Sequence, residues 1–306
     1  MRCALRHWRI VVKLLRFDNE ARPRLGVLAG EYIVPLDALA DVYPTMLSII
    51  AGGEDSLTKV RAITDAGQDK LPIAGVALLA PIERPGKYMA IGMNFKKHAE
   101  EAAALGVEKP KQQFWFNKQT TCIAGPYDPI DPGVSEKVDY EVELGVVIGK
   151  AAKGVSEAEA SAYVFGYTVA NDISARDWQF HSPTFTMGKS FDTHGPIGPW
   201  IVTADEIGDP HSLRLRCWVN GELRQDSDTS QLIFNVWQQI SYLSTAFTLE
   251  PGDLIATGTP EGVGVARQPP VFLQAGDVVR SEVEKIGTIE NRVLAPAARR
   301  AGRRPQ

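Results

Sequence analysis

Hydrophobic and polar residues alternate with a period of two in several short stretches of the chain, and this pattern predicts strands. The clearest case is 138–149, where one face is apolar and the other carries Glu141 and Glu143. Similar apolar stretches predict further strands at 12–17, 25–34, 163–170, 213–219, 222–225, 254–257 and 278–289. An Asn-Gly dipeptide at 220–221 favours a tight hairpin turn between two of these strands.

Apolar residues spaced three and four positions apart predict helices at 35–50, 56–66 and 229–247, and another helix that opens after Asn94. We expect Thr229 or Ser230 to cap the third of these helices. Two prolines and a glycine within 79–87 indicate a boundary. The sequence therefore predicts an α+β protein with a small N-terminal domain at 12–80, a β-rich catalytic domain at 84–294, and unstructured ends at 1–11 and 295–306.

The composition argues against several classes of protein but does not indicate a function. The 306 residues include 33 Lys plus Arg and 37 Asp plus Glu, a net charge of −4. A slightly acidic chain without a basic stripe is not typical of nucleic-acid binding. Three scattered cysteines are too few for a disulfide framework and suit a reducing compartment. The chain has no apolar run of the ~18 residues that a membrane span requires, so we expect a cytoplasmic protein.

Three acidic residues form the first candidate site. Glu141 and Glu143 are two residues apart on a predicted strand, so their carboxylates project from the same face. Such close anions need water, a shared proton or a cation, and carboxylates favour Mg²⁺, Mn²⁺ or Ca²⁺ over zinc. Asp172 follows the buried strand at 163–170, where it could also cap a helix or pair with Arg176. A solvated strand face remains an alternative for the two glutamates.

His98 and Glu101 are three residues apart and share one face of the helix predicted after Asn94. A glutamate bonded to one imidazole nitrogen raises the basicity of the other, which gives a general base for water. An exposed His–Glu pair without a catalytic role is the alternative. Arg176 and Gln179 share a helix face in the same way.

Two further segments contain candidate anion-binding groups. Lys189 lies among small residues and could hold an anion, although a surface charge is the usual role of a lysine. The glycine-rich segment 256–264 lacks the Lys-Ser/Thr of a phosphate-binding loop. Its glycines predict close approach of the backbone, with amides facing an anionic substrate.

These motifs together resemble the fumarylacetoacetate hydrolase superfamily. The matching stretches occur in the order found in that family: 92–95 with His98 and Glu101, 139–144, 171–177, 189–192 and 257–264. The resemblance covers roughly 84–294, and the N-terminal module is similar to the short domain of bacterial two-domain members. It implies an α+β fold built as a mixed β-sandwich roll, and a homodimer.

The resemblance also implies roles for particular residues. One Mg²⁺ or Mn²⁺ would be held by Glu141, Glu143 and Asp172. His98 and Glu101 would activate water from a segment that closes over the substrate, and Lys189 would stabilise developing negative charge. Arg176, Gln179 and Thr259 would contact the substrate. His194 replaces an aromatic residue of many relatives and would either hydrogen-bond a polar substrate or pack in the interior.

The implied chemistry is that of 2-oxo acids. We expect a metal-dependent hydrolase that cleaves a carbon–carbon bond in an acylpyruvate or another 2,4-diketo acid and releases pyruvate, in sugar-acid or aromatic catabolism. A decarboxylase or isomerase of an oxaloacetate-like 2-oxo dicarboxylate is the alternative on the same scaffold. A carboxylate-rich binding protein without catalysis is a third hypothesis. The expected partner is a small-molecule substrate, with neither nucleic acid nor membrane.

Overall fold

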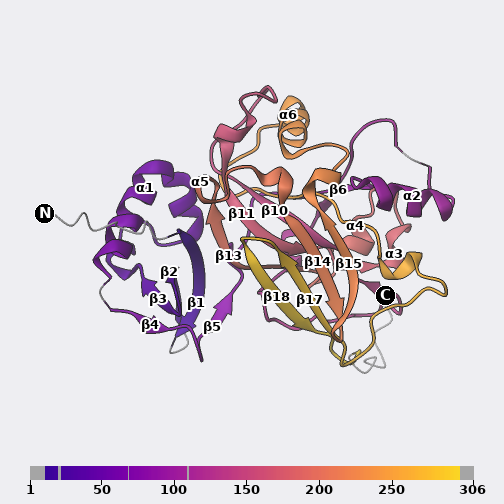
Figure 1. Ribbon diagram of the computed structural model, residues 1–306, viewed down its shortest axis with the longest axis horizontal. Coiled ribbons are helices and arrows are strands. Elements are labelled where there is room, and N and C mark those ends of the chain that lie inside the picture. Colours follow the sequence, from indigo (N-terminus) through magenta and orange to yellow (C-terminus); the bar gives the residue numbers. More distant parts are fainter. Residues whose placement is uncertain (1–10, 20–21, 68, 109, 297–306) are drawn as a thin grey trace, which may run out of the picture.

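The computed structural model describes residues 11–19, 22–67, 69–108 and 110–296. The predicted unstructured ends lie outside these residues, apart from Val11 and the two residues 295–296. The architecture is a mixed α+β fold dominated by sheets, as the sequence predicts (Figure 1).

A long sheet runs through the described part of the chain. Its strands are β1 (Lys13–Asn19), β2 (Arg22–Ala29), β3 (Tyr32–Pro35), β4 (Leu71–Pro72), β5 (Ala77–Leu79), β6 (Tyr88–Gly92), β7 (Phe114–Lys118), β8 (Ile123–Ala124), β10 (Val142–Ile148), β11 (Val164–Asn171), β13 (Gly195–Thr203) and β16 (Leu254–Ala256). Their order is β4-β3-β2-β1-β13-β11-β10-β16-β6-β7, with β5 against β1 and β8 against β13. Because β1 pairs with β13, the N-terminal strands continue the sheet of the larger C-terminal part.

A second sheet packs against the first. It contains β14 (Arg214–Val219), β15 (Glu222–Asp228), β17 (Val278–Val283) and β18 (Gly287–Arg292), in the order β15-β14-β17-β18. Strands β14, β17 and β18 contact β10, β11 and β13, and the two sheets enclose a core to which both contribute apolar side chains (Figure 1). A short ladder of β9 (Val138–Asp139) and β12 (Ser174–Ala175) lies beside them.

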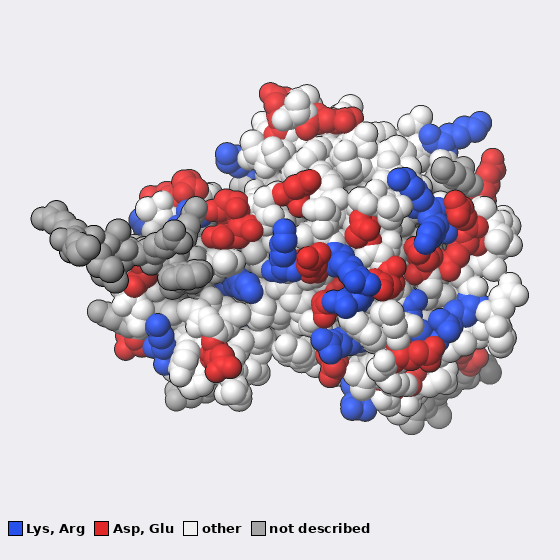
Figure 2. Space-filling view, viewed as in Figure 1, with Lys and Arg blue, Asp and Glu red and all other residues white. Residues whose placement is uncertain are grey.

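Helices cover opposite ends of this framework. The α-helices are α1 (Met46–Ala66), α2 (Lys96–Ala104), α3 (Arg176–Gln179), α4 (Thr186–Lys189), α5 (Ala204–Ile207) and α6 (Val236–Ala246). Helix α1 packs on the N-terminal strands, whereas α2, α3 and α4 gather at the other end of the molecule (Figure 1). In the described ranges, every helix is too short or too polar to cross a membrane. Figure 2 shows acidic and basic side chains interspersed over one face.

The period-two pattern places its residues as predicted. Val142, Leu144 and Val146 enter the core between the sheets, while Val147 belongs to the core on the opposite face. The predicted hairpin forms between β14 and β15, and its turn residues Asn220 and Gly221 both have positive φ, 52° and 81°. Both values suit the type of turn that Asn-Gly favours.

Two predictions near the N-terminus are wrong in detail. The stretch 25–34 is not one strand but parts of β2 and β3, because a turn at Gly30, with φ of 64°, reverses the chain. The helix predicted at 35–50 begins only at Met46. It joins the one predicted at 56–66 through a kink at Gly53, so that both belong to α1.

The helix predicted at 229–247 also begins later than expected. The carboxylate of Asp228 accepts a hydrogen bond from Ser230 N, and this caps a short 3₁₀ turn at Thr229–Gln231. Leu232 then returns to extended backbone, and α6 starts at Val236 with Asn235 as its N-cap. Asn235 and Gln238 form a reciprocal capping box.

Removal of the observed cap should destabilise the protein, whereas removal of Ser230, one of the two predicted caps, should not. Asn235→Ala leaves the first amides of α6 without their side-chain partner, and we expect a loss of about 1 kcal/mol in the free energy of unfolding. Ser230→Ala, at an exposed position, is the matched control. Urea denaturation of both variants checks this, and equal losses would contradict the assigned helix start.

Candidate active site

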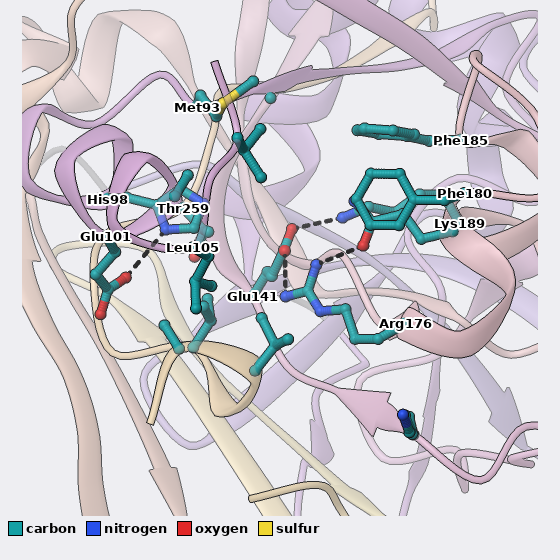
Figure 3. A pocket seen from close by; sticks show the side chains of 18 of the residues that line it. Met93, His98, Glu101, Leu105, Glu141, Arg176, Phe180, Phe185, Lys189 and Thr259 are labelled. Carbon is teal, nitrogen blue, oxygen red and sulfur yellow. Dashed lines mark hydrogen bonds and ion pairs between the residues drawn. The ribbon is translucent and has the colours of Figure 1, made fainter. Parts of the chain in front are cut away.

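Eight of the ten predicted site residues line a cavity of about 460 Å³, whereas Asp172 and His194 are not part of its lining. Its lining comes from β6, β7, β10, the helices α2, α3 and α4, and the loop after β16. The polar part of the lining consists of His98, Glu101, Lys137, Glu141, Glu143, Arg176, Gln179, Lys189 and Thr259. Figure 3 shows His98 and Glu101 on one side of Glu141, and Arg176 and Lys189 on the other.

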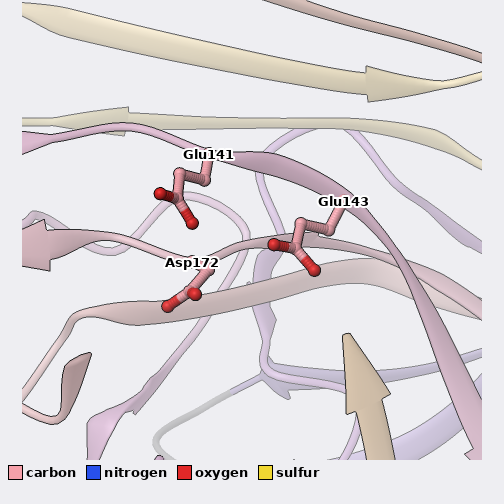
Figure 4. Close-up of side chains that lie close together, drawn as sticks. All are labelled: Glu141, Glu143 and Asp172. Atoms are coloured by element: carbon pink, nitrogen blue, oxygen red, sulfur yellow. The ribbon is translucent and has the colours of Figure 1, made fainter. Parts of the chain in front are cut away.

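Strand pairing explains why three acids that are distant in sequence converge. In the antiparallel pair β10–β11, Val142 lies opposite Asn171. The next residues continue this register, since Asp172 N donates to Glu141 O at 2.9 Å. Glu141, Glu143 and Asp172 are all buried and each offers an oxygen within 4.8 Å of the others (Figure 4).

Three cations neutralise part of this cluster. Lys189 Nζ donates to Glu141 Oε2 and to Asp172 Oδ2, both at 2.7 Å. Arg176 Nη2 donates to Glu141 Oε1 at 2.7 Å, and Lys118 Nζ donates to Asp172 Oδ1 at 2.5 Å. Burial alone would raise the pKa of Glu141, but Lys189 and Arg176 hold that pKa well below its usual range. The spacing also allowed an ion pair between Asp172 and Arg176. In the described residues this ion pair does not form, because Arg176 pairs with Asp139 and Glu141 instead.

Glu143 differs from the other two acids. In the described structure its hydrogen bond comes from Gly258 N at 2.7 Å, and no lysine or arginine forms an ion pair with it. Burial, together with repulsion from Asp172 and Glu141, raises the pKa of Glu143 well above its usual range. A buried set of carboxylate oxygens, in which Glu143 has no cationic partner among the described residues, suits a hard divalent cation such as Mg²⁺ or Mn²⁺.

The glycine-rich loop approaches closely, but its amides bind the protein's own carboxylates. Gly258 N donates to Glu143, Gly262 N donates to Glu101 Oε1 at 2.9 Å, and Gly264 N donates to Asp139 Oδ1 at 2.7 Å. Added Cβ atoms would lie 2.0 Å from Arg224 O at Gly262 and 2.1 Å from Val271 O at Gly264. The loop therefore holds the acidic groups in place rather than presenting these amides to an anionic substrate.

His98 and Glu101 form the predicted pair on α2. His98 Nδ1 lies 3.2 Å from Glu101 Oε2, and Glu101 is itself oriented by Gly262 N. Helix α2 is positioned through Asn94, whose side chain bonds Phe234 and Thr257 on two other segments. Because Glu101 engages Nδ1, the other ring nitrogen of His98 remains for proton transfer.

The predicted substrate-contacting residues have different surroundings. Gln179 Oε1 accepts from Arg176 Nη1 at 3.0 Å, while Thr259 Oγ1 donates to Val142 O and accepts from Gln225 Nε2. Both residues line the cavity. His194 does not line it: the ring is fully buried, stacks on Phe191 with centroids 5.2 Å apart, and bonds Asp131 O through Nε2. Two roles were left open for His194, and these contacts are those of a side chain that packs in the interior.

Sequence reasoning missed two residues of this cluster. Lys118 is buried and also bonds the carbonyls of Lys189 and Ile173. Its signal in the sequence is faint. Phe114, Phe116 and Lys118 are two residues apart along β7, so the lysine lies on the same face of the strand as two aromatic residues. Asp139 belongs to the quoted motif but had no assigned role, and it joins Arg176 to the glycine-rich loop.

Comparison with known families identifies the protein's class. The family model described as fumarylacetoacetate (FAA) hydrolase C-terminal matches residues 87–294. The chain belongs to the fumarylacetoacetate hydrolase family. This stretch contains the whole carboxylate cluster, the His98–Glu101 pair and the glycine-rich loop, so the expected family membership is confirmed.

Individual members of the family that are similar to this chain have different activities in their names. The Bos taurus mitochondrial protein named oxaloacetate tautomerase FAHD2B is 45% identical over 291 residues, 92% of each chain. The maleylpyruvate hydrolase of Sphingobium sp. SYK-6, solved with manganese(II) and pyruvate, has a TM-score of 0.79 and 32% identity over 93% of this chain and 100% of that one. The 5-carboxymethyl-2-hydroxymuconate delta-isomerase of Mycobacterium smegmatis has a TM-score of 0.73 and 34% identity over 94% of this chain and 100% of that one.

Removal of Lys118 should destabilise the protein strongly. Lys118→Met keeps the apolar stem but leaves the buried Asp172 with one ammonium instead of two. Loss of one partner from a buried ion pair costs about 3–5 kcal/mol, which urea denaturation of the metal-free protein would detect. Lys59→Met, which removes an exposed pair with Asp55, should have a much smaller effect. Equal effects would contradict the role assigned to Lys118.

His194 should make stability depend on pH. Burial and the nearby Lys118 lower the pKa of His194 from 6.5 to about 3 in the folded protein. As the pH falls below 6.5 the unfolded chain takes up the proton first, so the contribution of His194 to the free energy of unfolding should decrease by roughly 1 kcal/mol per pH unit down to about pH 3. Urea denaturation as a function of pH tests this. His194→Phe keeps a ring against Phe191 and should give a shallower slope; parallel profiles would contradict the prediction.

Proposed function

We propose that this protein is a metal-dependent keto–enol tautomerase of an oxaloacetate-like 2-oxo diacid. The observation that carries the proposal is the 45% identity, over 92% of both chains, to a protein named oxaloacetate tautomerase. This favours the isomerase alternative over the carbon–carbon hydrolase that we expected first. The bovine relative and the two structural neighbours described above have the names of enzymes, which argues against a non-catalytic binding protein.

Glu141, Glu143 and Asp172 would hold one divalent cation. Their three convergent oxygens fit Mg²⁺ or Mn²⁺, as does the lack of a cationic partner for Glu143 among the described residues, and a structural neighbour was solved with manganese(II) and pyruvate. When bound, the ion would supply Lewis acidity for the carboxylate and 2-oxo oxygens of the substrate.

His98 would move the proton that defines the reaction. With Nδ1 bonded to Glu101, its Nε2 would accept a proton from the carbon next to the 2-oxo group. His98 would then donate that same proton from Nε2 to the 2-oxo oxygen, so the keto form becomes the enol form without a water or a leaving group. The reverse reaction uses the same groups in the opposite order.

Lys189 would stabilise the negative charge that develops on the 2-oxo oxygen. An ammonium has three donors, and two of those of Lys189 bond Glu141 and Asp172. These carboxylates overcome the effect of burial and raise the pKa of Lys189, so the group stays charged. Arg176 directs Nε and Nη2 to Asp139 and Glu141 and one N–H of Nη1 to Gln179, which leaves the second N–H of Nη1 for the substrate carboxylate.

A carbon–carbon hydrolase is the second candidate. The same His98–Glu101 pair could activate a water, and the neighbour of TM-score 0.79 is named maleylpyruvate hydrolase. Decarboxylation of a 2-oxo diacid would use the same stabilised charge. The predicted homodimer and the predicted cytoplasmic location remain predictions alongside this proposal; the bovine relative is named mitochondrial.

The reactions can be separated with two substrates. Loss of enol absorbance from oxaloacetate reports tautomerisation, and coupled detection of pyruvate reports cleavage of acetylpyruvate or decarboxylation. We expect Mg²⁺-dependent tautomerisation that EDTA abolishes, and a decrease of about 10²–10⁴ in kcat/KM for His98→Ala. His211→Ala is the control, because His211 also bonds an acid, Asp209 at 2.8 Å, but lies away from the cavity.

Each result has a clear meaning. Efficient release of pyruvate from acetylpyruvate without tautomerisation would overturn the proposal in favour of the hydrolase. Turnover that survives both EDTA and His98→Ala would contradict the assigned site. An equal loss in His211→Ala would mean that the effect arises from stability and not from proton transfer.

A further inference from the structure

The cavity has more room than the reacting end of a 2-oxo acid requires. Its volume of about 460 Å³ lies within the range of pockets that hold drug-sized ligands. Besides the groups already assigned, its lining includes one further cation and a set of apolar residues from the segments 105–107 and 263–272: Lys137, Leu105, Val107, Val263, Val265, Ala266, Pro270 and Phe272.

Lys137 is the lining cation whose charge is not already satisfied. Arg176 and Lys189 are bonded to the acidic cluster. The described structure has no carboxylate within ion-pair distance of Lys137, and its Nζ lies 6.0 Å from the centre of the Phe272 ring. The side chain is exposed, yet it borders the same cavity as Glu141.

Backbone bonds fix Lys137 relative to the reacting end. Lys137 O accepts from Arg176 N at 2.9 Å, and Val138 O accepts from Leu273 N at 2.8 Å, which sets Phe272 beside Lys137. Lys137 precedes Glu141 by four residues, so their Cα atoms are at most about 14 Å apart. The side chain of Lys137 and the substrate together would span this separation.

We propose that Lys137 binds the terminal carboxylate of an extended 2-oxo diacid whose 2-oxo acid end lies at the acidic cluster. The apolar walls would contact the carbons between the two ends. A lone ammonium beside apolar walls suits a single carboxylate better than a phosphate, for which several donors usually converge. The inference rests on the proposed function and refines it, because it names the second anionic group and the length of the substrate.

A pair of ligands that differ only at the far end tests the inference. 2-Oxoadipate and 2-oxohexanoate have the same chain length, but only the first has a terminal carboxylate. Calorimetric titration of the Mn²⁺-loaded protein should show tighter binding of 2-oxoadipate by about fivefold, the effect of one partly exposed ion pair. Lys137→Met should remove this preference while the affinity for 2-oxohexanoate stays unchanged, and Lys137→Arg should keep it.

Lys150→Met is the matched control for a general loss of positive charge. Lys150 is exposed beyond the opposite end of β10 and does not line the cavity, so this variant should keep the preference. Equal affinity of the wild-type protein for both ligands, or a preference that persists in Lys137→Met, would overturn the inference.

Pyruvate separates this inference from the proposed function. Binding of pyruvate with no preference between the longer ligands would overturn only the role of Lys137 and the extended substrate. Failure of the Mn²⁺-loaded wild-type protein to bind any of the three 2-oxo acids would overturn the proposed function, and the inference with it.

Discussion

The antiparallel register between β10 and β11 is the constraint on which the site depends. With Val142 opposite Asn171, the residues just outside the pair, Glu141 and Asp172, are forced together, and Glu143 follows on the same face. A shift of one residue would turn the glutamates toward the apolar core between the sheets. The position of the carboxylates is thus a consequence of strand pairing, and the helices and loops around them complete the site.

Burial of these acids determines much of the surrounding structure. Charged groups removed from water require partners, and the partners come from separate parts of the chain: Lys118 from β7, Arg176 from α3, Lys189 from α4, and the amide of Gly258 from the loop after β16. Electrostatic compensation therefore joins segments that are distant in sequence. Among the described residues it leaves Glu143 without a cationic partner, which is why the cluster suits a divalent ion.

Local patterns were sufficient for part of this picture. Period two identified the face that carries Glu141 and Glu143, and helical spacing identified the pair of His98 and Glu101, because each relation involves residues only two or three positions apart. The same reasoning failed at 229–247 and 35–50. There, apolar spacing continues through residues whose backbone leaves the helix, and the true starts are set by the caps at Asn235 and Thr45.

The amino-acid sequence by itself determined which residue types occupy each face of a strand or helix, and its motifs were enough to indicate the family. Only the tertiary structure decided which charges meet. It paired Arg176 with Asp139, buried Lys118 against Asp172, directed the glycine-rich loop to the protein's own acids, and placed His194 in the interior. The physical reason is that periodicity is a property of neighbouring residues, whereas strand register, burial and charge compensation depend on contacts between distant ones.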